Sequence, residues 1–136
     1  MKLLIDANII LDVLQNRLPF VQDSSYVWKL CETSRDSGYI SALSFANLVY
    51  VMRKELDPGR IEEVHKQLEL IFRFTELTVS DMEKAVSRKW DDFEDCVQAV
   101  TAERIKADYI ITRNVKDFQK SKVMALTPSE YLARRI

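Results

Sequence analysis

Short apolar runs alternate along the chain with segments in which apolar residues recur every three or four positions. The runs predict buried strands at residues 3–5, 39–41, 74–79, 109–112 and 123–126. The periodic segments predict helices over residues 8–14, 21–34, 44–54, 61–72 and 92–106, a helix that begins at Ser80, and a last helix that Pro128 opens. Because strands and helices alternate, we expect an α/β fold in which helices cover both faces of a parallel sheet.

Local signals set the expected boundaries of these elements. Gly38 is expected to end the helix over residues 21–34, and residues 57–59 are expected to form a turn. Ser80 is expected to cap its helix, with Glu83 in the capping-box position. Seven aromatic residues fall mostly at core spacing and are interpreted as packing rather than as platforms for nucleobases: Tyr26, Trp28, Phe45, Tyr50, Phe72, Phe74 and Trp90. Trp28 is the exception among them, because it is a candidate for an interface.

Composition narrows the class of protein. The 136 residues include only 2 Gly and 3 Pro, which favours one compact domain over residues 1–136 rather than a low-complexity chain. Two Cys and one His are too few for a disulfide scaffold or a histidine-rich metal site. The sequence shows no signal peptide and no membrane span, which predicts a cytoplasmic protein. A net charge of −1 excludes a strongly basic nucleic-acid binder but not an acidic pocket that basic residues elsewhere offset.

Polar residues follow several of the predicted strands directly. Asp6 ends the first strand, Ser41 and Ser44 follow the second, and residues 112–114 follow the fourth. Sites in parallel sheets gather outside the carboxyl ends of the strands. We therefore expect these side chains to converge on one edge of the sheet.

Acidic residues are concentrated where the helix over residues 92–106 begins. Asp92 and Asp95 are three residues apart and so lie near one face of that helix. The helix dipole also explains acidic residues in a first turn, and an N-cap role would explain an Asp at position 6. If Asp6 and Asp95 meet, however, their charges repel unless a proton or a cation joins them, and Mg²⁺ or Mn²⁺ suits such oxygen ligands. Asn114 and Asp117 offer further oxygens, although each is also an ordinary turn or cap residue.

Three segments resemble the motifs of PIN-domain nucleases, and among them most resemble the VapC-like toxins of bacterial and archaeal toxin–antitoxin pairs. They are LIDANIILDVL at residues 4–14, DFEDCVQA at residues 92–99 and ADYIITRNVKDF at residues 107–118. The resemblance spans essentially the whole chain. It implies a PIN-like, three-layer α/β/α sandwich with a central parallel sheet. It also implies a metal-dependent ribonuclease that uses Mg²⁺ or Mn²⁺.

The resemblance also assigns roles to residues. It places catalytic positions at Asp6, Asp95, Asn47 and Asn114, where Asn47 replaces the family's usual Glu and Asn114 an acid that is often Asp. The expected metal ligands are Asp6, Asp95, Asp92 and Asn114, and the supporting residues are Thr112, Asp117 and Glu94. Two amides in place of carboxylates remove negative charge and should weaken cation binding. Arg113 and Lys116, on the loop after the fourth strand, are expected to contact the RNA backbone.

These expectations combine into one principal function and two alternatives. We expect hydrolysis of RNA phosphodiester bonds by a homodimeric toxin that an antitoxin protein blocks, with no membrane contact. One alternative is a catalytically weak or inactive PIN-fold module that binds RNA or protein, which the two Asn residues favour. The other is a phosphoacceptor domain of the receiver type, which is disfavoured because no Lys stands at the late-strand site.

Overall fold

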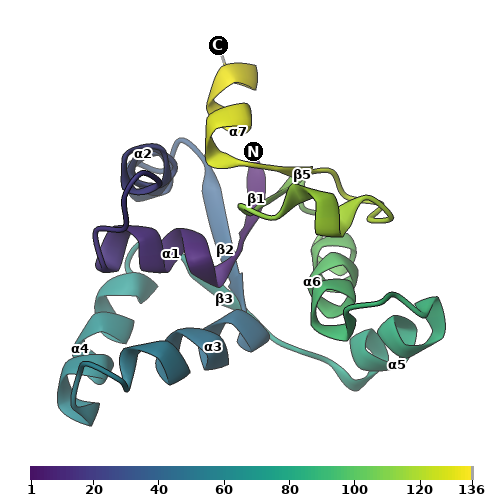
Figure 1. Cartoon of the computed structure of the whole chain (residues 1–136), viewed down its shortest axis with the longest axis horizontal. Helices are drawn as coiled ribbons and strands as arrows, with labels where there is room; N and C mark the ends of the chain where they lie inside the picture. Colours follow the sequence, from purple (N-terminus) through teal and green to yellow (C-terminus); the bar gives the residue numbers. More distant parts are fainter. Residues whose placement is uncertain (136) are drawn as a thin grey trace.

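The computed structural model describes residues 1–135 and consists of strands that alternate with helices (Figure 1). Ile136, the last residue of the expected domain, lies outside the described residues. The strands are β1 (Lys2–Ile5), β2 (Ser37–Ser41), β3 (Arg73–Thr75), β4 (Tyr109–Ile111) and β5 (Ala125–Leu126). The helices are α1 (Ala7–Leu14), α2 (Val21–Glu32), α3 (Ala42–Met52), α4 (Pro58–Glu69), α5 (Val79–Arg88), α6 (Phe93–Arg104) and α7 (Pro128–Arg134), with a 3₁₀ helix, η1 (Val115–Phe118).

The strands form one five-stranded sheet in the order β3-β2-β1-β4-β5. Every pairing is parallel, so all the strands end at the same edge. β1 is the central strand: Leu3 lies beside Gly38 of β2 and beside Tyr109 of β4. This topology puts the ends of β1 and β4, which are more than 100 residues apart in the chain, next to each other.

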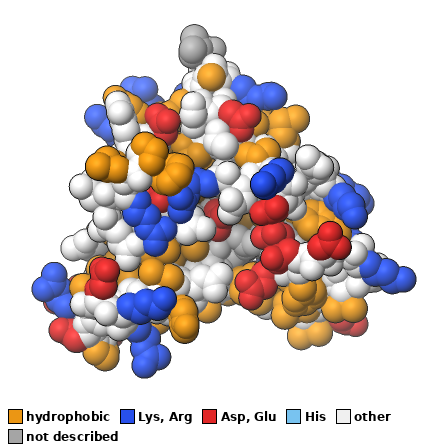
Figure 2. All heavy atoms as spheres, viewed as in Figure 1, with side chains coloured by type: hydrophobic (Ala, Val, Ile, Leu, Met, Phe, Trp, Pro, Cys, Tyr) orange, Lys and Arg blue, Asp and Glu red, His pale blue; other side chains and the backbone are white. Residues whose placement is uncertain are grey.

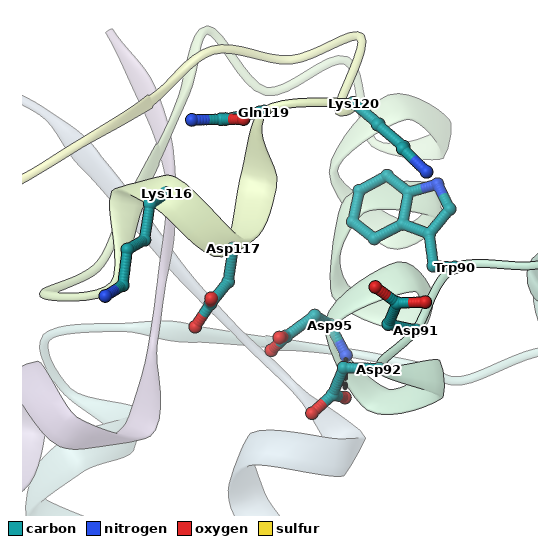
Figure 3. Close-up of a pocket in the computed structure, with 8 residues that line it drawn as sticks. All are labelled: Trp90, Asp91, Asp92, Asp95, Lys116, Asp117, Gln119 and Lys120. Atoms are coloured by element: carbon teal, nitrogen blue, oxygen red, sulfur yellow. Dashed lines mark hydrogen bonds between the residues drawn. The ribbon is translucent and has the colours of Figure 1, made fainter.

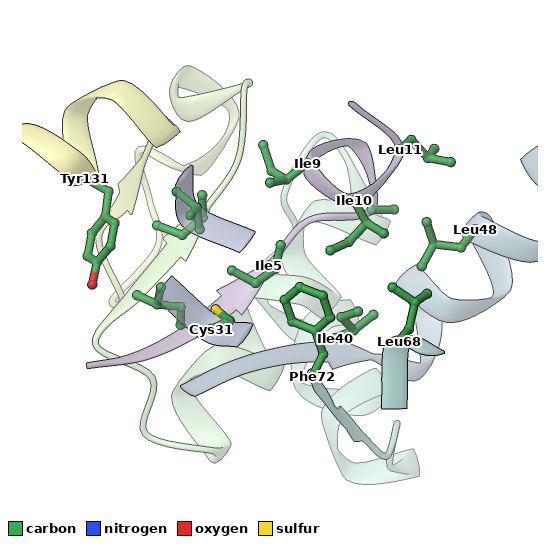
Figure 4. Packing of buried hydrophobic residues seen from close by; sticks show 14 of the residues in the cluster. Ile5, Ile9, Ile10, Leu11, Cys31, Ile40, Leu48, Leu68, Phe72 and Tyr131 are labelled. Carbon is green, nitrogen blue, oxygen red and sulfur yellow. The ribbon is translucent and has the colours of Figure 1, made fainter. Parts of the chain in front are cut away.

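Helices cover both faces of the sheet, and successive residues of β1 serve different cores. Leu3 and Ile5 belong to a core shared with α1 to α4 and with Tyr131 of α7 (Figure 4). Leu4 points to the other face, where it packs with Ala99 and Ala102 of α6. In Figure 1 the helices α1 to α4 lie on one side of the sheet, and α5 and α6 lie on the other. The three-layer α/β/α sandwich with a central parallel sheet is therefore confirmed.

Several predicted boundaries are wrong. Gly38 lies inside β2, where a Cβ atom would come within 2.7 Å of the Phe72 ring and 2.8 Å of the Cys31 sulfur. Close packing, and not helix termination, accounts for this glycine. Residues 57–59 are the start of α4, in which the Asp57 side chain accepts a hydrogen bond from the backbone N–H of Arg60.

The third strand and the helix after it also differ from the prediction. β3 ends at Thr75, and α5 begins earlier than expected, because Thr78 rather than Ser80 is its cap. The Thr78 hydroxyl accepts from the N–H of Asp81, and the Asp81 carboxylate accepts from the N–H of Thr78. Asp81, not Glu83, therefore completes the capping box.

The aromatic residues divide into two groups. Phe72 is buried, as predicted, and Trp28, which was a candidate for an interface, packs edge-on against it with ring centroids 5.1 Å apart. Tyr26 and Tyr50, in contrast, are 53% and 70% exposed, so their interpretation as core residues is wrong. Among the described residues, the helices are all too short or too polar to cross a lipid bilayer.

Candidate functional site

The pairing of β1 with β4 builds the first part of the site. Ile5 lies opposite Ile111, and the next residue, Asp6, donates its backbone N–H to the Ile111 carbonyl at 2.9 Å. The Thr112 hydroxyl, completely buried, then donates to the Asp6 carboxylate at 2.9 Å and accepts from the N–H of Asn114 at 3.1 Å. Asp6 occupies the N-cap position of α1, as the N-cap interpretation predicts, but its side chain makes no capping hydrogen bond there. Thr112 holds it instead.

Burial governs the ionisation of Asp6. It raises the pKa of the Asp6 carboxyl, and it outweighs the Thr112 hydrogen bond, the nearby N–H groups at the start of α1 and the Arg113 charge, all of which lower the pKa. The ionised form of Asp6 is therefore less stable in the folded protein than in water. A cation brought close to this carboxylate would reverse that penalty.

Asp95 supplies the second carboxylate, from the first turn of α6. Asp92 is the N-cap of this helix and accepts the N–H of Asp95 at 3.0 Å, so the cap also fixes the backbone from which Asp95 projects. Burial, followed by the negative charges of Asp92, Asp117 and Asp6, raises the pKa of Asp95 to about 6. Three segments, which are the start of α6, η1 and the residue after β1, thus place like charges around one carboxyl group.

Asp95 lies at a pocket of about 240 Å³ between the start of α6 and η1. The lining residues are Trp90, Asp91, Asp92, Asp95, Lys116, Asp117, Gln119 and Lys120 (Figure 3). Asp117 projects from η1 toward Asp95, and Asp92 lies directly beside Asp95. On the face shown in Figure 2, acidic side chains gather next to the central hollow, and basic side chains lie across it, over α1. The net charge of −1 therefore conceals separated regions of opposite charge.

The remaining expected site residues differ in how close they come to this pocket. Asp6 does not line it, but its charge acts on Asp95. Glu94 is exposed in the first turn of α6, and its charge also raises the pKa of Asp95. Asn114 is exposed at the start of η1, and Asn47 is exposed on α3. Neither amide is among the pocket-lining residues of the described chain.

Arg113 points to a different neighbour from the one expected. Its guanidinium lies 3.4 Å from the Asp12 carboxylate and 4.1 Å from the centroid of the Phe20 ring. Asp12 is completely buried on α1 and also accepts the Ser24 hydroxyl at 3.0 Å. Sequence reasoning missed Asp12, although a charged residue among the apolar positions of residues 9–14 is a detectable signal. Arg113 thus ties α1 to the loop that carries Thr112.

Ser41 and Ser44 were expected at the sheet edge as polar site residues. Both are buried there. Ser41 donates its hydroxyl to the Gln98 carbonyl at 2.5 Å, and the Gln98 amide donates to the Ser44 hydroxyl at 2.9 Å. This network joins the start of α3 to the middle of α6 and so braces the helix that carries Asp95.

The donor atoms of the site suit a hard divalent cation. The acidic side chains at the pocket offer only oxygen, and burial together with the charges of the neighbouring carboxylates raises the pKa of Asp95. Within residues 1–135, no three His, Cys, Asp or Glu side chains are arranged closely enough to hold a metal ion by themselves. Asp6, Asp92 and Asp95 offer oxygen donors of the kind that a hard divalent cation prefers, without forming a complete ligand set among the described residues.

Comparison with a family model identifies the chain. Residues 2–116 match the model described as "PIN domain". The chain belongs to the PIN domain family. The match covers β1 to η1, and so it includes every residue of the acidic pocket up to Lys116. No curated protein matches the sequence.

Solved structures confirm the fold of this PIN domain. FitAcB from Neisseria gonorrhoeae superposes with a TM-score of 0.68 at 20% identity, covering 93% of this chain and 98% of that one. A toxin–antitoxin complex from Klebsiella pneumoniae gives a TM-score of 0.68 at 19% identity, over 92% and 96% of the two chains. VapC20 from Mycobacterium tuberculosis, described as a sarcin-ricin loop cleaving toxin, gives 0.63 at 10% identity, over 79% and 86%. The chain thus has the fold of VapC-like toxins.

Proposed function

We propose that this PIN domain is an endoribonuclease that requires Mg²⁺ or Mn²⁺ and hydrolyses RNA phosphodiester bonds. The observation that carries the proposal is the state of Asp95, whose pKa is raised to about 6 by burial and by the charges of Asp92, Asp117 and Asp6. A structural carboxylate has a cationic or hydrogen-bonding partner. Asp95 has other carboxylates around it instead, which is the arrangement that a cation-dependent hydrolase needs.

Each residue has a distinct part in the proposed reaction. Asp6 and Asp95 would hold the cation, with Asn47, Asn114 and Asp92 contributing oxygens directly or through water. When bound, a divalent cation neutralises charge on the phosphate and makes water a better nucleophile. Thr112 fixes the orientation of the Asp6 carboxylate, and Asp117 and Glu94 add negative charge around Asp95. Lys116 lies at the pocket to receive a phosphate, whereas Arg113 would reach the RNA from its place beside Asp12.

Cleavage of single-stranded RNA in the presence of Mn²⁺ tests this function. The wild-type protein should cut, and EDTA should stop the reaction. Asp6→Asn and Asp95→Asn should each reduce the rate by at least about 100-fold, the upper end of what is lost when a group that only supports a metal ligand is removed. Asp57→Asn is the matched control, because Asp57 caps α4 outside the pocket and Asn caps helices equally well. Equal cleavage by all four proteins would refute the proposal.

We also propose that an antitoxin protein controls the nuclease and that the active form is a homodimer in the cytoplasm. Support comes from FitAcB and from the Klebsiella pneumoniae complex, one of which is described as a toxin–antitoxin complex. Large apolar side chains are also exposed on and after α1, among them Leu18 at 80% and Phe20 at 40%. An antitoxin co-expressed with this chain should co-purify with it and inhibit cleavage. Sedimentation of the free chain as a monomer would contradict the dimer.

A PIN-fold module without hydrolytic activity is the second candidate function. Asn47 and Asn114 stand where acids are usual in the family, and no preassembled three-residue ligand set exists among the described residues. This candidate predicts binding of RNA or protein without any cleavage in Mn²⁺. Restoring acids with Asn47→Glu and Asn114→Asp separates the two candidates. If the wild-type protein is an inactive module, RNA cleavage appears only in the substituted protein, whereas an enzyme cleaves RNA before the substitutions are made.

A further inference from the structure

Trp90 lies beside the acidic pocket because of how α5 ends. Lys89 follows the helix in the left-handed conformation, with φ of 56°, and this reverses the chain before α6 begins. Trp90 is the next residue, in the short connection that leads to the Asp92 cap. The turn therefore delivers an indole ring to the wall of the pocket, next to Asp91 (Figure 3).

The indole is held on one side and accessible on the other. It packs partly against both apolar clusters around α6, and its ring meets the Phe118 ring at 75° with centroids 6.4 Å apart. Trp90 is only half-buried, and the remainder of its surface lines the pocket, so the interpretation of Trp90 as packing alone is incomplete. A rigidly held, partly exposed aromatic ring is a surface on which a nucleobase can stack.

Positive charge lies at the same pocket as the carboxylates. Lys116 on η1 and Lys120, two residues beyond η1, are both exposed and line the same pocket as Trp90. Figure 3 shows the Lys120 amino group close to the indole and Lys116 on the opposite side of Asp117. The pocket thus combines carboxylates for a cation, ammonium groups for phosphates and an aromatic ring, within about 240 Å³.

We propose that Trp90 stacks an unpaired base of single-stranded RNA while Lys116 and Lys120 bind the adjoining phosphates. This rests on the proposed ribonuclease function, because it places the base next to the phosphodiester that Asp95 would act on. A base within a duplex is already paired and stacked, so the indole cannot reach it. The pocket therefore selects single-stranded over double-stranded RNA, without hydrogen bonds that read a particular base.

Tryptophan fluorescence tests the contact directly, because the described chain supplies its own control. The protein has 2 Trp, and Trp28 lies in the other core, edge-on to Phe72. Trp28→Phe leaves Trp90 as the single reporter, and Trp90→Phe leaves Trp28. Oligouridylate, added with Ca²⁺ in place of Mn²⁺ and checked for integrity on a gel, should quench Trp90 and leave Trp28 unchanged. Quenching of neither, or of both equally, while RNA is bound would overturn the proposal.

Binding measurements separate the base from the backbone. Trp90→Ala should weaken oligouridylate binding by about 5- to 150-fold, the range that one base–aromatic stack contributes. An abasic ribose-phosphate oligomer should bind both proteins equally, since it has no base to stack. Trp90→Phe, which keeps an aromatic ring and a better-filled core, should lose less than Trp90→Ala. If Trp90→Ala weakens both ligands alike, the loss is structural and the stacking proposal is wrong.

Two lysines test the phosphate contacts. Lys120→Ala should weaken binding and flatten its dependence on salt, because one fewer phosphate is neutralised. Lys122→Ala is the matched control, since Lys122 is exposed nearby but lines a different pocket. Equal salt slopes for the two variants would overturn the role of Lys120.

The failure of this proposal is distinguishable from that of the nuclease. If RNA is bound and cut while Trp90 fluorescence and the Trp90→Ala affinity stay unchanged, only the stacking subsite is refuted. If the protein neither binds nor cuts oligouridylate and other single-stranded RNAs, the proposed function and the subsite fail together.

Discussion

Asp36, which is buried, and Asp95, which is half-buried, lie toward opposite ends of the sheet and have contrasting surroundings. Asp36 precedes β2, at the amino ends of the strands, and its carboxylate accepts from Tyr131 at 2.6 Å and from Arg135 at 2.9 Å. The N-terminal amine lies 3.3 Å away. Burial alone would raise the pKa of Asp36, but these partners outweigh it and hold the pKa below its usual value. Asp95, at the carboxyl ends, has acids for neighbours, and its pKa is raised.

The difference shows which part of the molecule is optimised for stability. Ionised Asp36 ties the chain's first residue and α7 to the start of β2, so its charge stabilises the fold. Ionised Asp95 is repelled by the neighbouring carboxylates, so its charge destabilises the fold. Perturbed carboxylates of this second kind are concentrated at functional sites.

The largest effect should come from breaking the structural cluster. Asp36→Asn leaves Arg135 without its ion pair, and it should lower the free energy of unfolding by about 3 kcal/mol in urea denaturation. Arg135→Ala should also destabilise the protein, whereas the neighbouring exposed Arg134→Ala should stay within about 0.5 kcal/mol of wild type. Similar values for Arg134→Ala and Arg135→Ala would show that Asp36 is not a latch for α7.

The next largest effect concerns the group that orients Asp6. Thr112→Val removes the hydroxyl that donates to Asp6 and accepts from Asn114, and it should reduce Mn²⁺-dependent cleavage by roughly 10- to 100-fold. Thr112→Ser retains both hydrogen bonds and should retain most of the activity. An equal loss of activity in the two variants would show that packing at this position, and not the hydroxyl group, determines the rate.

The two aspartates should also respond oppositely to pH in the presence of EDTA. The folded pKa of Asp36 lies below its unfolded value of 3.8, so the stability it contributes is present above pH 3.8 and is lost as the pH falls below that value. The folded pKa of Asp95 is about 6 against 3.8, so stability is lost as the pH rises from about 4 to 6. Asp95→Asn should remove that loss, on the order of 1–2 kcal/mol, from unfolding curves recorded across this range. A curve for Asp95→Asn parallel to the wild-type curve would contradict the assignment.

The smallest effect compares two helix caps. Asp92 and Asp57 cap α6 and α4 through the same hydrogen bond to a backbone N–H three residues on. Because Asn and Asp cap equally well, Asp92→Asn and Asp57→Asn should leave the free energy of unfolding within about 0.5 kcal/mol of wild type. Only Asp92→Asn should weaken Mn²⁺ binding, by a few-fold, in isothermal titration. Equal Mn²⁺ affinities would assign Asp92 a capping role alone.

The sequence predicted the parallel sheet and the position of Asp6 directly after the central strand because both depend on patterns that act over short stretches. Apolar runs mark strands such as Tyr109–Ile111, and the shared edge of parallel strands then collects the residues that follow them. Asp92 and Asp95 were paired correctly by their helical spacing. No long-range contact had to be known for these steps.

Features that depend on long-range packing could not be predicted in this way. Gly38 is required by Phe72, which is 34 residues away, and the Arg113 side chain is directed by Asp12 on another element. The partial exposure of the Trp90 side chain depends on how the turn at Lys89 is placed relative to η1. In each case the local signal was ambiguous, and the partner in space decided the outcome.

Thermal unfolding with Mn²⁺ tests most directly whether the acidic pocket is an uncompensated cation site. The wild-type Tm should rise with Mn²⁺ concentration and then follow the saturation of one binding equilibrium. Asp95→Asn should have a higher Tm than wild type in EDTA at pH 7.5 and should lose most of the rise with Mn²⁺. A lower Tm for Asp95→Asn in EDTA, or an undiminished response to Mn²⁺, would contradict the account.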